Sequence, residues 1–188
     1  MSAPEHVRAF VALELEPRLR DAMGELQARL RPRLGNVHLV RPEGIHLTLR
    51  FLGSATAQQR DTMRPILAAA ASACPPAEAR VSGLGTFPDR GSPRVLWLGL
   101  DVPPSFGELQ KACERAALAA GFEKEDRPFR AHLTLGRWRD RAPRPELPAA
   151  DLGTTRLDTL VLFRSELRPD GAVYTPLERF TLGRAAVD

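Results

Sequence analysis

The chain of 188 residues is poor in cysteine, with only two. Cys74 and Cys113 lie far apart, each in an alanine-rich segment that resembles a helix, and neither belongs to a CxxC motif. This placement favours two reduced thiols in or near the core over a disulfide, and it argues against a thiolate metal site. A small scaffold held together by disulfides is excluded.

Long apolar runs are also missing, since no stretch approaches 18 apolar residues, so no membrane span is expected. The first residues, MSAPEHVRAF, lack the charged region, apolar stretch and cleavage site of a signal peptide. We therefore predict a cytoplasmic protein. A hydrophobic content of 43% and a charged content of 27% are typical of a soluble globular protein. The length fits a single domain over residues 1–188, which can be built from two similar lobes.

Lysine is scarce as well, and nearly all of the basic residues are arginine. Lys111 and Lys124 are the only lysines, although the net charge is +4 and the isoelectric point about 9.8. GC-rich coding would enrich arginine, alanine, glycine and proline together. A phosphate-rich partner would also favour arginine, because guanidinium groups bind phosphate in a bidentate manner. The charge alone leaves both explanations open.

Alternation and helical periodicity predict strands joined by three helices. The predicted helices cover residues 17–34, 56–73 and 105–120, and capping boxes are expected at Thr56/Gln59 and Ser105/Glu108. The predicted strands cover residues 7–15, 37–40, 45–52, 80–87, 94–101, 129–138, 157–167 and 172–182. Residues 139–155 form a polar, proline-rich connection, and Pro169-Asp170-Gly171 turns the closing hairpin.

One short motif occurs twice. Residues 45–49 read IHLTL and residues 131–135 read AHLTL, so two of the four histidines begin the same tetrapeptide. Because side chains alternate along a strand, His46 and Thr48 share one face, as do His132 and Thr134, while the leucines face a core. Each half of the chain supplies such a strand after a helix. We therefore predict a pseudo-symmetric α+β protein with the two HLTL strands near each other at its centre.

Two imidazoles and two hydroxyls facing one space suit phosphoryl chemistry without a metal. A neutral histidine can take a proton from the attacking water, and an imidazolium can give one to the departing oxygen. The hydroxyls of Thr48 and Thr134 can bind the non-bridging phosphate oxygens.

Other interpretations of the motif are weaker. A single H-x-T-x strand is usually only a strand, but two identical copies among four histidines favour a site. A zinc site lacks HExxH, a third nearby histidine and flanking acids, and a serine triad lacks the GxSxG elbow. His6 and His38 have no comparable neighbours.

Neighbours of the two motifs can be sorted by the same alternation. Arg130 shares the face of His132 and is a candidate phosphate ligand, with a solvated strand end as the alternative. Arg50 shares the face of His46. Phe51 and Arg137 fall on the opposite face, where core packing is the expected role of Phe51. If the strand twists, Phe51 can instead stack on a nucleobase.

These segments resemble the two-histidine (2H) phosphoesterases, and within them the RNA 2′,3′-cyclic phosphodiesterases, also called 2′-5′ RNA ligases. The resemblance rests on VRPEGIHLTLRFLG (40–53) and FRAHLTLGR (129–137), which are similar to the two motif blocks of that family. Supporting similarity is found in VRAFVALEL (7–15), PRVLWLGL (93–100) and LVLFRSELRPDGAVYTPLERFTL (160–182). Ala131 departs from the family, which commonly has proline before the second histidine.

The resemblance implies a bilobal fold with two antiparallel sheets around a central cleft and helices on the outside. It implies hydrolysis of a 2′,3′-cyclic phosphate to a 2′-phosphomonoester, without metal or cofactor, and reversible 2′-5′ ligation. His46, Thr48, His132 and Thr134 would form the active site. We assign His132 as the base and His46 as the acid, an assignment that the sequence does not fix.

Two rival functions stay open. A 2H esterase for another cyclic phosphate or a 2′-5′ oligonucleotide would use the same four residues with a different pocket rim. A basic RNA-binding module without turnover would keep the motifs, although binding alone does not require two proton-transfer groups. We expect a monomer that acts on RNA ends or nucleotides.

Overall fold

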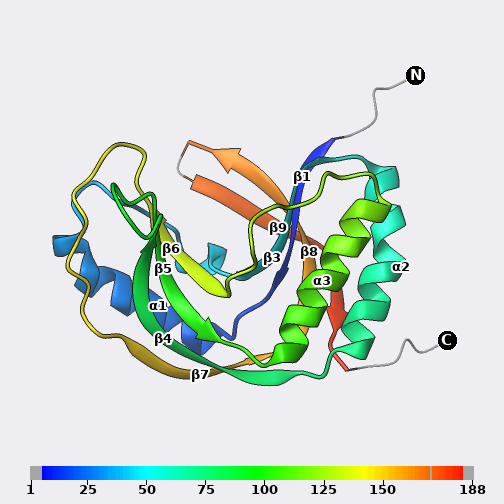
Figure 1. The fold of residues 1–188 in the computed structure, drawn as a ribbon, viewed down its shortest axis with the longest axis horizontal. Helices are drawn as coiled ribbons and strands as arrows, with labels where there is room; N and C mark the ends of the chain where they lie inside the picture. Colours follow the sequence, from blue (N-terminus) through cyan, green and yellow to red (C-terminus); the bar gives the residue numbers. More distant parts are fainter. Residues whose placement is uncertain (1–5, 170, 184–188) are drawn as a thin grey trace.

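The computed structural model describes residues 6–169 and 171–183, which form one curled antiparallel sheet with helices on its outer side (Figure 1). The strands are β1 (Val7–Leu13), β2 (His38–Leu39), β3 (Leu47–Ala55), β4 (Ala77–Phe87), β5 (Val95–Asp101), β6 (His132–Arg137), β7 (Asp151–Leu157), β8 (Thr159–Arg168) and β9 (Gly171–Thr181). The α-helices are α1 (Pro17–Leu30), α2 (Ala57–Ala73) and α3 (Pro104–Ala119), and short 3₁₀ turns cover Arg31–Arg33 and Pro42–Gly44.

The strand order is β7-β4-β5-β6-β3-β1-β8-β9, with β2 on the free part of β6, and every pair is antiparallel. The family resemblance implied two antiparallel sheets around a central cleft. The two sheet halves are present, but they join into one sheet through a single residue pair, Leu47 opposite Leu133. That pair lies inside the two HLTL motifs, so the predicted meeting of the motifs at the centre is confirmed.

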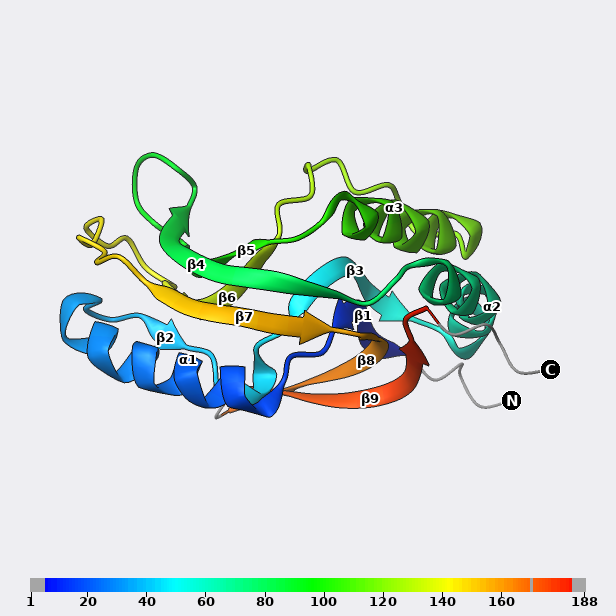
Figure 2. The same ribbon diagram turned by 90° about the horizontal axis from the view of Figure 1, so that it is seen from below.

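The helices cover the two sheet halves unequally, as the view from below shows (Figure 2). Helices α2 and α3 pack against each other, with α3 against β3 and α2 against β9. Helix α1 instead contacts β7 and therefore lies on the half that carries the second motif. Each motif strand is thus backed by a helix from the other half of the sequence.

Helical periodicity predicts an inward-facing stripe on each helix. The predicted positions of α1 and α3 are all buried: Leu19, Met23, Leu26, Leu30, Leu109, Ala112, Cys113 and Ala116. Of those predicted for α2, Met63 and Leu67 are buried, whereas Ile66 and Ala70 are only partly buried. Cys74 and Cys113 are both buried and free, which confirms the expectation of two reduced thiols. Burial raises the pKa of Cys113 to about 12, so this thiol stays protonated and unreactive at neutral pH.

One of the two predicted capping boxes forms. The Thr56 hydroxyl accepts from the Gln59 backbone N–H at 3.1 Å, and the Gln59 side chain accepts from the Thr56 N–H at 3.0 Å. The prediction of a capping box at Ser105 and Glu108 is wrong, because α3 begins one residue earlier, at Pro104. Ser105 is then inside the helix, and the Glu108 carboxylate pairs with Lys111 at 2.8 Å.

The segment 139–155, predicted to be a connection without regular structure, contains most of a strand. Its last residues form β7, which pairs with β4 at one edge of the sheet. An edge strand needs few apolar side chains, so β7 lacks the alternation by which the other strands were found. The closing hairpin pairs β8 with β9 up to Arg168 opposite Gly171, and Asp170 of the predicted turn lies outside the described residues.

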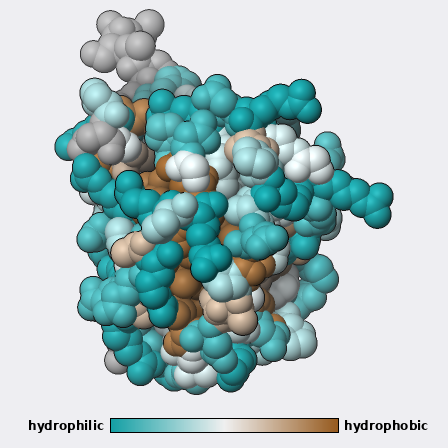
Figure 3. Space-filling model, turned by 90° about the vertical axis from the view of Figure 1, so that its left-hand side faces the viewer, coloured by the Kyte–Doolittle hydropathy of each residue, from teal (hydrophilic) through white to brown (hydrophobic). Residues whose placement is uncertain are grey.

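Hydrophilic side chains cover most of the molecular face shown in Figure 3, and hydrophobic ones are visible mainly in the crevices between them. None of the helices in the described part of the chain is long and apolar enough to cross a membrane.

Candidate functional site

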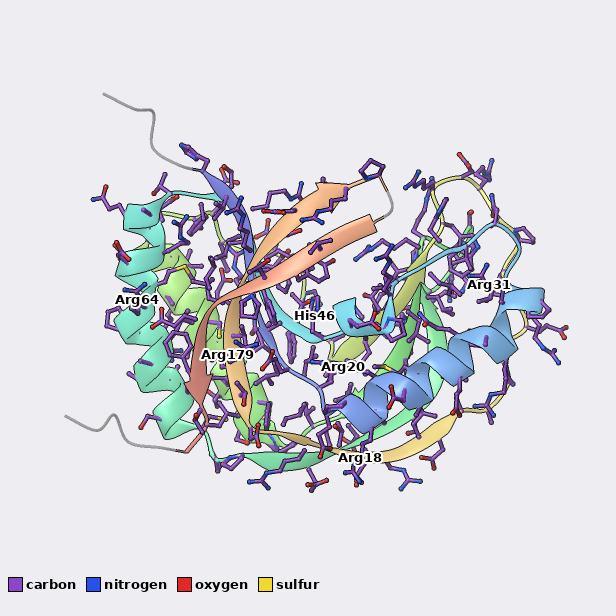
Figure 4. The ribbon with its side chains drawn as sticks, turned by 180° about the vertical axis from the view of Figure 1, so that it is seen from behind. Arg18, Arg20, Arg31, His46, Arg64 and Arg179 are labelled. Atoms are coloured by element: carbon purple, nitrogen blue, oxygen red, sulfur yellow. The ribbon has the colours of Figure 1, made fainter. Side chains whose placement is uncertain are left out.

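The two motifs lie side by side at the seam of the sheet. All four motif leucines are buried, as the alternation predicted: Leu47, Leu49, Leu133 and Leu135. Because β3 and β6 are antiparallel and Leu47 lies opposite Leu133, the register puts Thr48 opposite His132 and His46 opposite Thr134. Figure 4 shows His46 in the space between the two halves of the molecule.

A small pocket of about 60 Å³ opens at this seam. The residues that line it include His46, Thr48, Phe51, Thr134, Arg137 and Tyr174. His132 does not line the pocket itself but lies two positions before Thr134 on the same face of β6. The structure therefore brings together the four motif residues that the sequence singled out, and it adds Arg137 and Tyr174.

His46 is held among aromatic rings. Its ring stacks on Phe10, with centroids 4.5 Å apart, and lies nearly perpendicular to the Tyr174 ring, with centroids 5.2 Å apart. The pKa of His46 is lowered to about 4, mainly by burial and to a smaller extent by the positive charges of Arg20 and Arg137. A hydrogen bond to the Gly44 carbonyl opposes the shift. The imidazole is therefore neutral in the free protein near pH 7.

His132 has a similar backbone partner and a more open setting. Its Nδ1 lies 2.7 Å from the carbonyl oxygen of Arg130, and its ring is perpendicular to that of Phe87, with centroids 5.1 Å apart. Burial lowers its pKa, with contributions from Arg137 and Arg130. With Nδ1–H donated to a carbonyl, Nε2 of the neutral ring is left as the proton acceptor.

A β-bulge changes the alternation after the first motif. In the pairing of β1 with β3, Ala12 lies opposite Thr48 and Val11 opposite Arg50, so Leu49 is an extra residue. Beyond the bulge, each side chain points to the sheet face opposite to the one that simple alternation predicts. The prediction that Arg50 shares the face of His46 is therefore wrong.

Arg50 is buried on the helix side, where its Nε lies 2.5 Å from the Glu114 carboxylate of α3. Phe51 moves to the pocket side and is 50% exposed, so its expected core role is wrong too.

The second motif has the matching bulge. In the pairing of β5 with β6, Trp97 lies opposite Thr134 and Leu96 opposite Gly136, which leaves Leu135 as the extra residue. Arg137 therefore turns to the same side as Thr134 and lines the pocket, where alternation had placed it on the opposite face. The glycine after the second motif was the available signal, because glycine inside a strand often marks a bulge.

A helix glutamine binds the carbonyl of each bulged leucine. Gln27 of α1 is buried and donates from Nε2 to the carbonyls of Leu135, at 2.9 Å, and Val40, at 2.7 Å. Gln110 of α3 donates to the carbonyl of Leu49 at 3.4 Å. The two bulges are thus fixed by helices that come from distant parts of the sequence.

Arg130 lies at the rim of the site rather than in the pocket lining. Its guanidinium pairs with Asp89 at 3.1 Å and lies over the Phe87 ring, 4.6 Å from the centroid. Its role as a phosphate ligand stays a prediction. Among the described residues, no group of three or more His, Cys, Asp or Glu side chains is placed to hold a metal ion.

Two H-x-T-x motifs at the seam of a two-lobed antiparallel sheet define the two-histidine phosphoesterase class. Within it, the chain belongs to the 2′-5′ RNA ligase superfamily, whose sequence profile matches residues 15–166.

Among its relatives, the RNA 2′,3′-cyclic phosphodiesterase of Methanothermobacter thermautotrophicus is 33% identical, with 94% of this chain and 99% of the relative aligned. The enzyme of the same name from Thermus thermophilus is 34% identical over 94% of this chain and 90% of the relative.

Two solved structures have a fold similar to that of this chain. A crystal structure of a Thermus thermophilus protein matches with a TM-score of 0.82 and 32% identity over 94% of this chain and 98% of the other. The crystal structure of E. coli LigT with 3′-AMP matches with a TM-score of 0.84 and 25% identity, covering 96% of this chain and 100% of that one. The α+β fold deduced from the motifs is confirmed.

Proposed function

We propose that this protein is an RNA 2′,3′-cyclic phosphodiesterase, which hydrolyses a 2′,3′-cyclic phosphate end to a 2′-phosphomonoester. The observation that carries the proposal is the pairing of two H-x-T-x strands at one seam, with Thr48 opposite His132 and His46 opposite Thr134. The names of the relatives support the same reaction.

In the proposed reaction, water attacks phosphorus, the new P–O bond forms, and the bond from phosphorus to the 3′ oxygen breaks. One histidine takes the proton of the water, and the other donates a proton to the departing 3′ oxygen. Thr48 and Thr134 donate hydrogen bonds to the non-bridging oxygens, and the Arg137 guanidinium offsets their negative charge. A 5′-hydroxyl in place of water would give a 2′-5′ linkage by the same steps, which is the proposed ligase activity.

The division of roles between the histidines is a separate question. Our initial assignment, which the sequence does not fix, makes His132 the base and His46 the acid. The low pKa of His46 in the free protein makes it the harder ring to protonate, which favours the reverse assignment. A bound phosphate anion would raise the pKa of both rings, so only a measurement on the reaction separates the two assignments.

The pocket is small, about 60 Å³, which suits a phosphate group. In this proposal the nucleoside extends past the rim, where Phe51 and Tyr174 offer aromatic surfaces. We propose that Phe51 stacks on the terminal base, and that Arg130 contacts the phosphate after leaving Asp89.

The test is hydrolysis of 2′,3′-cyclic AMP by the purified protein in EDTA, followed by ³¹P NMR of the product. We expect a 2′-phosphate signal, and loss of turnover in His46→Ala and His132→Ala. Full activity of either variant would refute the mechanism. A product from another cyclic phosphate alone would indicate a different 2H esterase, and RNA binding without turnover would indicate a binding module.

We further propose a cytoplasmic monomer. One chain supplies the two histidines and two threonines that the proposed reaction requires, all of them at a single seam. Two free, buried cysteines suit a reducing compartment. Sedimentation at micromolar concentration would test the oligomeric state.

A further inference from the structure

The catalytic pocket continues into a much larger groove. This groove has a volume of about 590 Å³, compared with about 60 Å³ for the pocket. Four residues line both: Val40, Phe51, Arg137 and Tyr174. A molecule whose phosphate occupies the pocket can therefore extend directly into the groove.

The groove is positively charged. Arg8 of β1, Arg137 of β6 and Arg139 line it together with His38, and none of its described lining residues is acidic. Within the described residues, none of these three guanidinium groups forms an ion pair. We call this surface the arginine groove. Cations without an acidic partner are available to phosphate groups.

The arginine groove also has apolar surface suited to bases. Leu167, near the end of β8, is 69% exposed and lines the groove, and Phe51 is 50% exposed at the boundary with the pocket. Exposed apolar side chains beside arginines are a combination found in proteins that bind single-stranded nucleic acid, where bases contact apolar surface and cations follow the backbone.

A second cavity on the other side of Phe51 fits RNA less well. It has a volume of about 430 Å³ but shares only Phe51 with the catalytic pocket. Glu123 and Glu125 line it together with Lys124 and with Arg50, which is already paired with Glu114, so its acidic and basic side chains balance. A lining with both signs of charge attracts phosphates less than one with cations alone, so the arginine groove is the better path.

We propose that the arginine groove binds the single-stranded RNA chain immediately 5′ to the nucleotide that carries the cyclic phosphate. The inference rests on the proposed function, because it takes the cyclic phosphate to occupy the catalytic pocket. In such an RNA the terminal ribose continues only through its 5′ oxygen, so the chain must leave the pocket on the nucleoside side. Arg8 and Arg139 contact the phosphates of that segment, and Leu167 contacts a base. The preferred substrate is then an RNA end rather than a free cyclic nucleotide.

The experiment compares kcat/KM for 2′,3′-cyclic AMP with kcat/KM for a hexaribonucleotide that ends in the same cyclic nucleotide. We expect the wild type to prefer the hexanucleotide. Arg8→Ala and Arg139→Ala should each lower kcat/KM for the hexanucleotide by about tenfold, the effect of losing one charge-assisted hydrogen bond. The loss should be at least about fivefold larger for the hexanucleotide than for cyclic AMP.

Arg64→Ala is the matched control, because Arg64 lies on α2 at the outside of the molecule and pairs with Glu178 (Figure 4). It removes the same charge and should leave the substrate preference as in the wild type. Salt adds a second readout: the slope of log kcat/KM against log salt should fall by about 0.7 for each phosphate contact removed.

Equal losses on both substrates, or no loss on the hexanucleotide, would overturn the arginine groove as an RNA site. A wild type that hydrolyses neither substrate would instead contradict the proposed function. In that case the groove is tested by fluorescence anisotropy of the labelled hexanucleotide. Weaker binding to Arg8→Ala and Arg139→Ala than to Arg64→Ala would support the groove, and equal binding would overturn it.

Discussion

The two halves of the site share a backbone design and differ in their surroundings. In both, a histidine binds the carbonyl of the residue two positions earlier, which is Gly44 for His46 and Arg130 for His132. In both, the last leucine of the motif is the extra residue of a bulge. In both, a glutamine from a helix donates to that leucine's carbonyl.

The differences lie in what surrounds each motif. His46 lies among Phe10, Phe163 and Tyr174, whereas His132 meets the single ring of Phe87. Five residues after the histidine, the first half has Phe51 and the second half has Arg137. In each case the bulge turns the side chain to the pocket. The two halves therefore have similar backbones, but the first presents apolar side chains to the pocket and the second presents a cation. This asymmetry suits a substrate that has a base on one side and a phosphate on the other.

The largest effect is expected at the two histidines, and it can reveal how their roles divide. Loss of a general acid or base lowers kcat by roughly 10²–10⁴-fold. A substrate whose 3′ oxygen is replaced by sulfur has a leaving group that needs no acid. We expect this substrate to restore much of the rate of one variant, His46→Ala or His132→Ala, and not of the other. The restored variant identifies the acid, and equal restoration of both would contradict the division into acid and base.

The next effect concerns the threonines. Thr48→Val and Thr134→Val should each lower kcat by roughly 10²–10³-fold, as measured for donors that stabilise a developing negative charge. Valine keeps the shape of the side chain, so the fold should be retained. Thr175→Val, at an exposed position of β9, is the control and should behave as the wild type. A change in KM alone would mean that the hydroxyls bind the ground state and transition state equally well.

The two glutamines should differ in their effect on stability. Gln27→Leu removes two hydrogen bonds in a buried setting and should lower the free energy of unfolding by about 1–3 kcal/mol. Gln110→Leu removes one longer bond and should cost about 1 kcal/mol or less. Urea denaturation measures both. The Leu135 bulge turns Arg137 to the pocket, so loss of the bulge in Gln27→Leu should weaken substrate binding and raise KM. A Gln27→Leu variant with lower stability and a normal KM would show that the bulge persists without the glutamine.

The pH dependence of stability tests the surroundings of His46 alone. The pKa of His46 is about 4 in the folded protein and near 6.5 when unfolded, so the unfolded state binds more protons between these values. Stability should therefore fall as the pH is lowered from about 6.5 towards 4. Thermal unfolding of His46→Gln should show a shallower dependence in this window than the wild type, and a slope as steep as that of the wild type would contradict the assignment of the low pKa to His46.

Much of the site could be predicted from the sequence. The repeated tetrapeptide, the alternation of His and Thr against leucine, and the shortage of other histidines were enough to select four residues and to place their strands together. This worked because alternation is a local property of extended backbone and does not depend on the rest of the fold.

The sequence did not reveal the bulges, and so it misplaced Arg50, Phe51 and Arg137. A bulge depends on the register with a partner strand, here β1 for the first motif and β5 for the second. The edge strand β7 was missed for a related reason, since its pairing with β4 leaves little trace in its composition.

The local sequence pattern was enough to select the four side chains proposed to perform the chemistry and to place them on two strands. The surroundings of those side chains depend on the fold. The rings that desolvate His46 and lower its pKa come from β1, β8 and β9. The bulges that turn Phe51 and Arg137 to the pocket lie in the pairing with β1 and β5, and glutamines on α1 and α3 donate hydrogen bonds to the bulged leucines. Desolvation and strand register both arise from contacts between residues distant in the chain, which no local pattern records.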